Sequence, residues 1–437
     1  MTIHNAPRDH AASTRLLPFT AAVTAFAVMA LLYLAGPAAL YTAILRAWGI
    51  DPFAFVFLDT DTVLSAVRCV RLGVDVFAVN PCDPLGRLFS YSPLWLLLAE
   101  LPEPMTRLNA SGLIVCAGYF TALLLLPAAP TRRDAWLVAL GAVSTAAVFA
   151  VERGNNDLVL FALAAVAATL ACKSPGLRLV GYGAALLAGL LKYYPMTLLA
   201  LAARETPARF ALAVALAGIA TAAFLLAMGD ELMRALSIIP TGEWFGDMFG
   251  SSTVAGGLGE LLFWPPMVSS IVHIAMCLSA LAAGLWLAAR PAFRTAVSAL
   301  DDRQQAFLLV GALLTLSCFF TAQNIGYRAI HLLLVLPSAL ALARLGHGSR
   351  ALRWLPRLLL LLLWGDGLRN VIQHLPVADP ATLRLTSWAL RELAWWLLIP
   401  ILIACVTILL ARSEMALRLL PRLVRRLAPE PPASLSR

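Results

Sequence analysis

The chain has 437 residues, of which 61% are hydrophobic and only 13% are charged, and its mean hydropathy is +0.82. A soluble protein of this length has too little interior to bury so much apolar surface, whereas about 20 consecutive apolar residues are enough to span a bilayer. The apolar runs are continuous, not alternating, which excludes a transmembrane β-barrel. We therefore expect an all-α polytopic membrane protein.

The net charge of +9 does not indicate a nucleic-acid-binding protein. Most of the 33 lysines and arginines fall in short loops on one side of the expected helices, which is the positive-inside pattern of membrane proteins. This pattern predicts a multi-pass protein of the cytoplasmic membrane with both termini in the cytoplasm. The basic residues then contact membrane lipids, and no nucleic-acid partner is expected.

Apolar run length and charge together predict ten simple spans. They lie at about 16–41, 107–128, 135–151, 157–172, 208–229, 266–289, 305–322, 329–343, 357–372 and 386–411.

A further apolar stretch, 179–203, is divided by Lys192-Tyr193-Tyr194-Pro195 and has basic residues on both flanks. It is either two short helices that meet at this tip or a re-entrant hairpin, so the protein has ten to twelve transmembrane helices. We expect one transmembrane domain, 1–411, followed by a basic, proline-containing cytoplasmic tail, 412–437.

A polar loop, 42–92, follows the first span and is expected to lie outside the membrane and to contain interfacial helices. Asp59 and Asp61 begin its most helix-like part. A carboxylate at this surface can act as a general base toward a sugar hydroxyl, although an acid at a helix start is also a common N-cap. Cys69 and Cys82 share the loop and can form a disulfide under oxidising conditions.

The turn from Glu152 to Asp157 is also expected on the outer side. Glycine and asparagine suffice for a tight turn, so the additional charged groups suggest substrate binding. Its candidate binding residues are Glu152, Arg153, Asn155 and Asn156.

Lys192 lies between two apolar half-helices, where a lysine is costly unless it reaches the surface or binds an anion. Lys192 and Tyr194 are therefore candidates for binding a phosphate, and snorkelling of Lys192 to the interface is the alternative. Arg328 can bind a phosphate bidentately, together with Asn324 and Tyr327, or can serve as an interfacial anchor.

Three other features have weaker signals. His331 is expected to be a hydrogen-bonded structural residue. The Gly- and Ser-rich loop 244–259 is either a flexible lid or an acceptor-binding loop, with Ser251 and Ser252 as its candidate ligands. No cysteine or histidine spacing suggests a metal site.

Taken together in this order, these segments resemble the GT-C superfamily of membrane glycosyltransferases, and most closely glycosyltransferase family 87. The resemblance covers about residues 15–345. The matching positions are Asp59, Ala66, 73–77, Tyr91-Ser92-Pro93, the turn 152–157 and Lys192-Tyr193-Tyr194-Pro195. The segment from Asn324 to Arg328 is similar to that of the family's uncharacterised bacterial relatives and differs from that of its better-known members. A Ser-Pro-x-Ser-Trp element of the better-known members is absent, because Ser317-Cys318-Phe319 occupies its place.

The resemblance implies metal-independent, inverting transfer of a mannose-like hexose from a polyprenyl-phosphate donor to a lipid or glycan acceptor. Asp59 is then the general base, with Asp61 as the second candidate, Tyr91 lies at the substrate, and Lys192 and Arg328 hold the phosphate. No cofactor beyond the lipid-linked donor is expected. A transporter or flippase of a lipid-linked or anionic substrate, for which Asp366 and Arg369 are suited, and an inactive scaffold remain alternatives.

Overall fold

The computed structural model describes residues 6–53, 55–346, 348–373 and 379–419. Its regular structure is almost entirely helical, and six helices are long and apolar enough to cross a membrane. A seventh crossing results if the pair α5 (Arg132–Ala142) and α6 (Thr145–Arg153), bent by 44°, is counted as one span. The protein therefore has the expected all-α polytopic architecture. The six candidate spans are Thr14–Ala35 within α1 (Ala6–Ala35), α9 (Pro207–Ser237), α11 (Pro266–Ala289), α13 (Asp302–Thr321), Gly326–Leu345 and α17 (Pro380–Ala411).

By length and composition, the described residues contain fewer spans than the ten to twelve expected, because several apolar runs fold into shorter pieces. The runs 107–128 and 157–172 form α4 (Leu108–Leu123) and α7 (Asn156–Leu170), while 357–372 is divided between α15 (Arg350–Leu363) and α16 (Gly365–Gln373). The run 329–343 remains a candidate span, in which the 3-10 helix η4 (Gly326–His331) continues into α14 (Leu332–Leu345). Two further short helices, α12 (Pro291–Ser298) and α18 (Glu414–Leu419), lie outside the expected spans. Residues 420–437, most of the predicted tail, lie outside the described residues.

The first expected span, 16–41, is wrong as a single helix. Pro37 has no backbone N–H and adopts an extended conformation with ψ of 128°, so α1 ends at Ala35 and α2 (Ala38–Ala47) begins after Pro37. The rings of Tyr33 and Tyr41 then pack with centroids 5.3 Å apart, so α2 folds back against α1.

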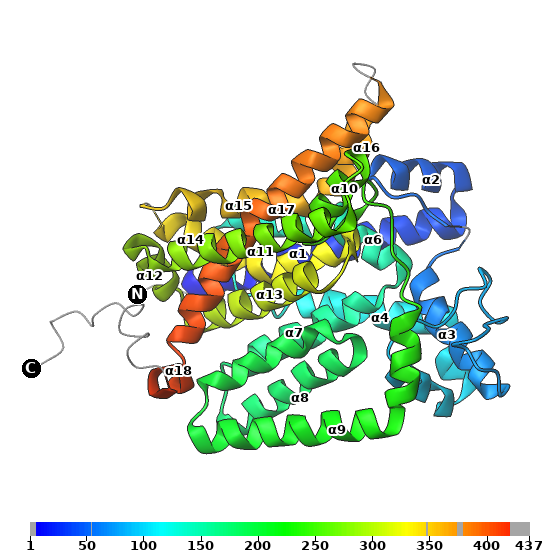
Figure 1. The fold of residues 1–437 in the computed structure, drawn as a ribbon, viewed down its shortest axis with the longest axis horizontal. Coiled ribbons are helices and arrows are strands. Elements are labelled where there is room, and N and C mark those ends of the chain that lie inside the picture. Colours follow the sequence, from blue (N-terminus) through cyan, green and yellow to red (C-terminus); the bar gives the residue numbers. More distant parts are fainter. Residues whose placement is uncertain (1–5, 54, 347, 374–378, 420–437) are drawn as a thin grey trace, which may run out of the picture.

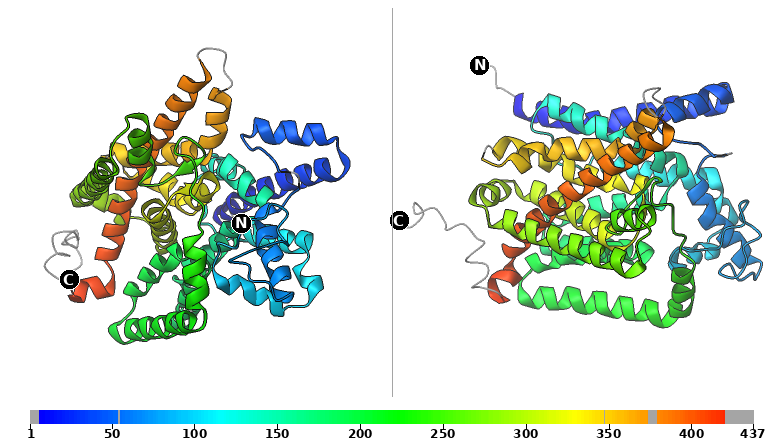
Figure 2. Two further views of the ribbon diagram at one scale, coloured as in Figure 1. Left: turned by 45° about the vertical axis from the view of Figure 1, so that its right-hand side comes forward. Right: turned by 45° about the horizontal axis from the view of Figure 1, so that its top comes forward.

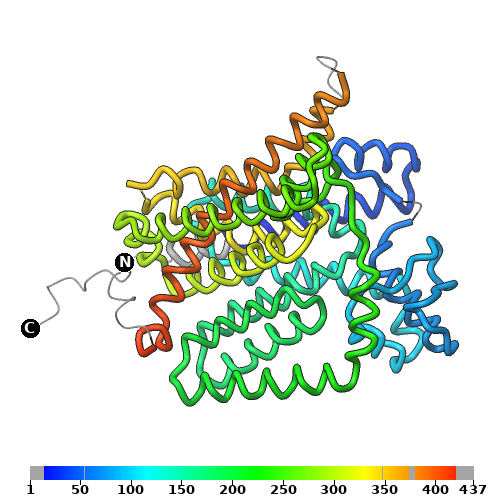
Figure 3. The backbone as a smooth tube through the Cα atoms, in the orientation of Figure 1, coloured from blue at the N-terminus to red at the C-terminus, as the bar shows by residue number. Residues whose placement is uncertain are grey.

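The long helices run side by side, and the two ends of the bundle differ (Figures 1 and 2). The helix α3 (Leu58–Arg71) and the loops around it form one end, at the right of Figure 1, whereas the start of α1, α12 and α18 lie toward the opposite end. The tube in Figure 3 shows α9 turning sharply in its last part, where Met228 has non-helical torsion angles.

The stretch 179–203 forms two helical segments that meet at the tip 192–195, as both expected arrangements require. The helix α8 (Pro175–Lys192) ends at Tyr193, whose φ of +62° reverses the chain into the 3-10 helix η3 (Tyr194–Arg204). At the open end of the hairpin, Arg178 Nη2 donates to Glu205 Oε2 over 3.0 Å, and the Tyr182 hydroxyl donates to Glu205 Oε1 over 2.8 Å.

The Gly- and Ser-rich loop is more ordered than expected. It contains the strand β1 (Met248–Phe249), which pairs antiparallel with β2 (Asn324–Ile325), and the helix α10 (Thr253–Leu261). Arg391 and Arg369 donate to the carbonyl of Gly246, and Arg391 Nη1 binds Asp366 Oδ1 over 2.8 Å. These bonds fasten the segment before Ser251 to α16 and α17.

In the loop 42–92, the disulfide between Cys69 and Cys82 is confirmed, with their Cα atoms 5.7 Å apart. Arg71, the last residue of α3, donates to the carbonyls of Ala99 and Leu101 at the 3-10 helix η1 (Pro93–Glu100), and to Thr106 in η2 (Glu103–Thr106). The disulfide therefore joins α3 to the loop that follows it, and Arg71 joins the end of α3 to the segment 99–106.

We expect replacement of both cysteines by serine to lower the free energy of unfolding by about 3 kcal/mol, since the bond closes a short loop in the unfolded chain. Thermal unfolding of the purified protein measures this change. A reducing agent should lower the wild-type Tm toward that of the variant and leave the variant unchanged. Equal stability of wild type and variant under oxidising conditions would show that the bond is absent.

Candidate functional site

The centre of the candidate site is Asp157, the second residue of α7, whose side chain is 0% exposed. Its Oδ2 atom accepts a hydrogen bond from Lys192 Nζ over 2.7 Å and lies 3.4 Å from Arg328 Nε. Its Oδ1 atom accepts from the Tyr194 hydroxyl over 2.7 Å and lies 3.8 Å from His331 Nε2. We call these five residues the Asp157 cluster.

Burial of a carboxylate is favourable only when cations and hydrogen-bond donors surround it, which explains the composition of the cluster. The Lys192 and Arg328 side chains are only 10% and 20% exposed, so Lys192 does not snorkel and Arg328 is not an interfacial anchor. Two cations share one carboxylate, which leaves one positive charge in excess. His331 is hydrogen-bonded, as expected, with Nε2 2.7 Å from the Tyr194 hydroxyl.

Arg328 is oriented from a second side by Asn324, whose Oδ1 atom accepts from Arg328 Nη1. The Asn324 amide is itself fixed, because Nδ2 donates to the carbonyls of Cys318 and Ala322. Tyr327 is buried, with its ring 5.4 Å from that of Phe149.

Asp59 lies in the first turn of α3, and it is not the N-cap. The N-cap position belongs to Phe57, which has a φ of +64° and no side-chain capping bond. Asp59 Oδ2 accepts from Asn155 Nδ2 over 2.6 Å, while Oδ1 lies 3.8 Å from Arg153 Nη1. The carboxylate is therefore held by a neutral amide, and the arginine stands beyond hydrogen-bond range.

The turn between α6 and α7 explains how Asn155 reaches Asp59. Gly154 adopts a φ of +53°, and a Cβ there would meet Thr60 Oγ1 at 2.4 Å, so both its conformation and its surroundings require glycine. Asn155 is the N-cap of α7, with Oδ1 accepting from the Asp157 backbone N–H over 2.8 Å. Since this bond fixes the amide oxygen, Nδ2 is left to donate to Asp59.

Two further bonds fasten α3 to the same turn. The Phe57 backbone N–H donates to the carbonyl of Glu152 over 2.8 Å, and Thr60 Oγ1 donates to the carbonyl of Gly154 over 2.6 Å. The start of α3 and the turn 152–155 thus form one unit.

Tyr91 connects Asp59 with the Asp157 cluster. Burial raises the pKa of the Tyr91 hydroxyl and the Asp59 carboxylate raises it further, whereas the Arg328 guanidinium lowers it. The Tyr91 ring also lies 5.9 Å from Lys192 Nζ. All these groups therefore belong to one site.

Glu152, Arg153 and Asn156 are the other residues of the turn 152–157. The Arg153 guanidinium lies over the rings of Phe53 and Phe149, at 4.1 and 5.0 Å, and Arg153 Nε is 3.5 Å from Glu152 Oε2. The Asn156 side chain is buried, and its Nδ2 atom has no hydrogen-bond acceptor among the described residues.

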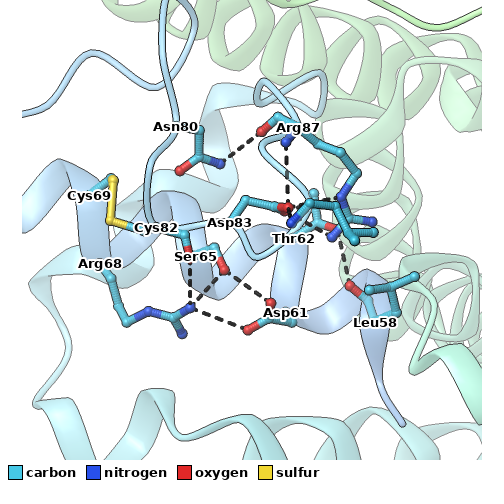
Figure 4. Close-up of polar contacts among 11 residues, drawn as sticks. Leu58, Asp61, Thr62, Ser65, Arg68, Cys69, Asn80, Cys82, Asp83 and Arg87 are labelled. Carbon is cyan, nitrogen blue, oxygen red and sulfur yellow. Dashed lines mark hydrogen bonds and ion pairs between the residues drawn. A yellow bond between two sulfur atoms is a disulfide. The ribbon is translucent and has the colours of Figure 1, made fainter. Parts of the chain in front are cut away.

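Asp61 points in another direction (Figure 4). Its carboxylate accepts from Ser65 Oγ over 3.1 Å and from Arg68 Nη2 over 3.3 Å, and Arg68 also donates to the carbonyl of Cys82. Asp61 therefore holds the disulfide-closed loop.

Ser251 and Ser252 also make their contacts elsewhere. Ser251 donates its backbone N–H to the Phe319 carbonyl over 2.7 Å and lies 2.9 Å from His273 Nε2, while Ser252 immediately precedes α10. These contacts place Ser251 beside α11 and α13.

Within the described ranges, no group of three or more His, Cys, Asp or Glu side chains is arranged to hold a metal ion. Comparison of the chain with protein-family models, curated proteins and solved structures finds no match.

Asp157 is the member of the site that the sequence analysis did not single out. It resembles an ordinary acid in the first turn of a helix, which is favourable there for electrostatic reasons alone. The available signal was Lys192: a lysine within an apolar stretch needs a buried anion, and an acid in the neighbouring turn supplies one.

We expect Asp157→Asn to lower the free energy of unfolding by about 3–5 kcal/mol, because it leaves two buried cations without their carboxylate. Thermal or denaturant unfolding of the purified protein measures the loss. Asp75→Asn is the matched control, since Asp75 pairs with Arg234 at an exposed position and should change stability little.

A second substitution, Lys192→Met, should recover part of the stability lost in Asp157→Asn. If the two substitutions instead lower the free energy of unfolding additively, the loss in Asp157→Asn does not come from the unpaired Lys192.

Proposed function

We propose that the protein is a GT-C-type membrane hexosyltransferase that takes a mannose-like hexose from a polyprenyl-phosphate donor. The observation that supports this most directly is the position of the Asp59 carboxylate, held by Asn155 beside a buried cluster with an excess positive charge. A base next to an anion-binding group is the pair that transfer from a sugar phosphate requires.

Lys192 and Arg328 are suited to the donor phosphate. Lysine supplies a compact charge with three donors, whereas arginine supplies a planar fork, and both lie at the same Asp157 oxygen. Asn324 fixes the guanidinium, so its orientation is set before the donor binds.

In the proposed reaction, Asp59 accepts the proton of an acceptor hydroxyl as that oxygen attacks the anomeric carbon of the hexose. The bond between this carbon and the phosphate oxygen breaks, and its electron pair leaves with the polyprenyl phosphate. Attack opposite the leaving group inverts the anomeric configuration. Lys192 and Arg328 stabilise the charge that develops on the leaving phosphate in a site with little water.

The reaction is proposed at the outer face of the cytoplasmic membrane, with both termini inside. The Cys69–Cys82 disulfide supports this orientation, since disulfides persist in oxidising compartments. The opposite end of the bundle carries the start of α1 and α18.

The transporter alternative loses its main argument. Asp366 and Arg369, the residues that most favoured it, bind Arg391 and the backbone of the 245–246 segment. They therefore fasten a loop and have no need of a transported ion.

Asp59→Asn should lower kcat by about 10²–10⁴-fold, which is the usual contribution of a general base, and should leave donor binding nearly intact. The asparagine can still accept the Asn155 hydrogen bond, so stability should change little. The assay is transfer by purified protein from a polyprenyl-phosphate hexose. Asp61→Asn is the matched control and should be milder; a larger loss in Asp61→Asn than in Asp59→Asn would move the base to Asp61.

Lys192→Ala and Arg328→Ala should each raise the KM for the donor, and the double variant should lose less than the sum of the two free-energy changes. The reason is that both side chains meet at one carboxylate oxygen and would share one phosphate. Donor titration of the four proteins measures the coupling. Strict additivity would mean that the two cations do not share a ligand.

The identity of the sugar and acceptor is open to direct measurement. Mass spectrometry of glycolipids and glycans from a deletion strain should show one species that lacks a hexose. That species identifies both the transferred sugar and the acceptor. Unchanged profiles would contradict the proposed transfer.

A further inference from the structure

An apolar cavity of about 460 Å³ lies between α1, α2, α4 and α6. Its size falls within the usual range for small-molecule sites. Its walls are built from side chains such as Phe26, Met29, Leu45, Tyr119 and Val148. A cavity of this kind accommodates a hydrocarbon chain.

The cavity reaches the candidate site through Phe57 and Glu152, which both line it. Phe57 stands two residues before Asp59, and Arg153, next to Glu152, lies 3.8 Å from Asp59. A molecule that fills the cavity therefore has its end at the proposed base.

Glu152 is only 8% exposed, and its Oε2 atom has no hydrogen-bond donor among the described residues. The nearest cation is Arg153, with Nε 3.5 Å away. A buried carboxyl oxygen without a donor is costly, and a hydroxyl of a bound molecule would satisfy it.

The charges distinguish between the two lipids that the proposed reaction brings together. Around the end of the cavity, two acids, Asp59 and Glu152, face one cation, Arg153, so no positive charge is in excess there. The Asp157 cluster, by contrast, has two cations at one carboxylate. A phosphate headgroup is therefore disfavoured at the end of the cavity and favoured at Lys192 and Arg328.

We propose that this cavity holds the hydrocarbon chain of an uncharged, hydroxyl-bearing lipid acceptor, whose headgroup donates a hydrogen bond to Glu152 beside Asp59. The proposal rests on the proposed function and narrows its acceptor from a lipid or glycan to a lipid. Since membrane lipids are as apolar as the cavity wall, the chain alone gives little selectivity. Selection comes from the headgroup.

The test uses two photoactivatable probes with the same diazirine-bearing alkyl chain. One has a neutral hexose headgroup and the other has a phosphate. Each is crosslinked to the purified full-length protein in nanodiscs, and labelled peptides are mapped by mass spectrometry. The hexose probe should label α1, α2 and α4 saturably and at least about 5-fold more than the phosphate probe.

Ala25→Phe places a ring in the cavity wall, and Ala27→Phe is its matched control, because Ala27 is exposed on the same helix and does not line the cavity. The first variant should lose most hexose-probe labelling of these helices, and the second should keep it. Glu152→Leu should reduce the preference for the hexose headgroup to less than about 2-fold.

Three results would overturn the proposal. Equal, unsaturable labelling by both probes would mean that ordinary membrane lipid fills the cavity, and preference for the phosphate probe would assign it to the donor chain. Equal labelling of the Ala25 and Ala27 variants would place the probe elsewhere.

Failure of the lipid-site proposal can be distinguished from failure of the proposed enzyme activity. Selective labelling without transfer from any polyprenyl-phosphate hexose would support the lipid site and contradict the enzyme. Transfer to a water-soluble glycan without selective labelling would do the reverse.

Discussion

The buried carboxylate of Asp157 is the constraint on which the site depends. It joins the start of α7, the tip of the hairpin of α8 and η3, and the 3-10 helix before α14. Lys192 and Arg328 are both cations in largely apolar surroundings, and neither is stable there without an anion. The carboxylate neutralises one charge and leaves the other, so the group that holds these segments together also keeps a second cation buried beside it.

Asn155 extends this constraint to Asp59, because one amide serves two segments at once. Its oxygen caps α7 and its nitrogen holds the Asp59 carboxylate. A neutral donor positions the carboxylate without the strong stabilisation of the anion that a direct ion pair gives. Asp61 has such a pair with Arg68, at 3.3 Å. The two acids are only two residues apart, yet Asp59 lies at the turn before α7 and Asp61 lies at the disulfide-closed loop.

The sequence was informative where a feature is local and less so where tertiary contacts decide. Apolar length placed α11 at its observed bounds, and charges on both flanks predicted that the chain reverses at Lys192. Run length wrongly predicted one helix over 16–41, because the helix ends before Pro37 within this apolar stretch. It also could not show that the loop around Met248 pairs with a strand far along the chain. Asp157 was missed because its burial depends on partners from two other segments.

The same long-range pairing explains why the last helices matter to a site built mainly from the first half of the chain. Arg391 on α17 binds Asp366, and Asp366 Oδ2 lies 1.7 Å from where a Cβ on residue 326 would be. Only glycine leaves room for that carboxylate beside β2, and Arg328 follows two residues later. Because β1 pairs with β2 while Arg391 and Arg369 hold the segment before β1, the backbone that carries Arg328 is fixed from two sides. Contacts from α17 therefore help to hold the Arg328 guanidinium at Asp157, so the geometry of the Asp157 cluster depends on helices from both halves of the chain.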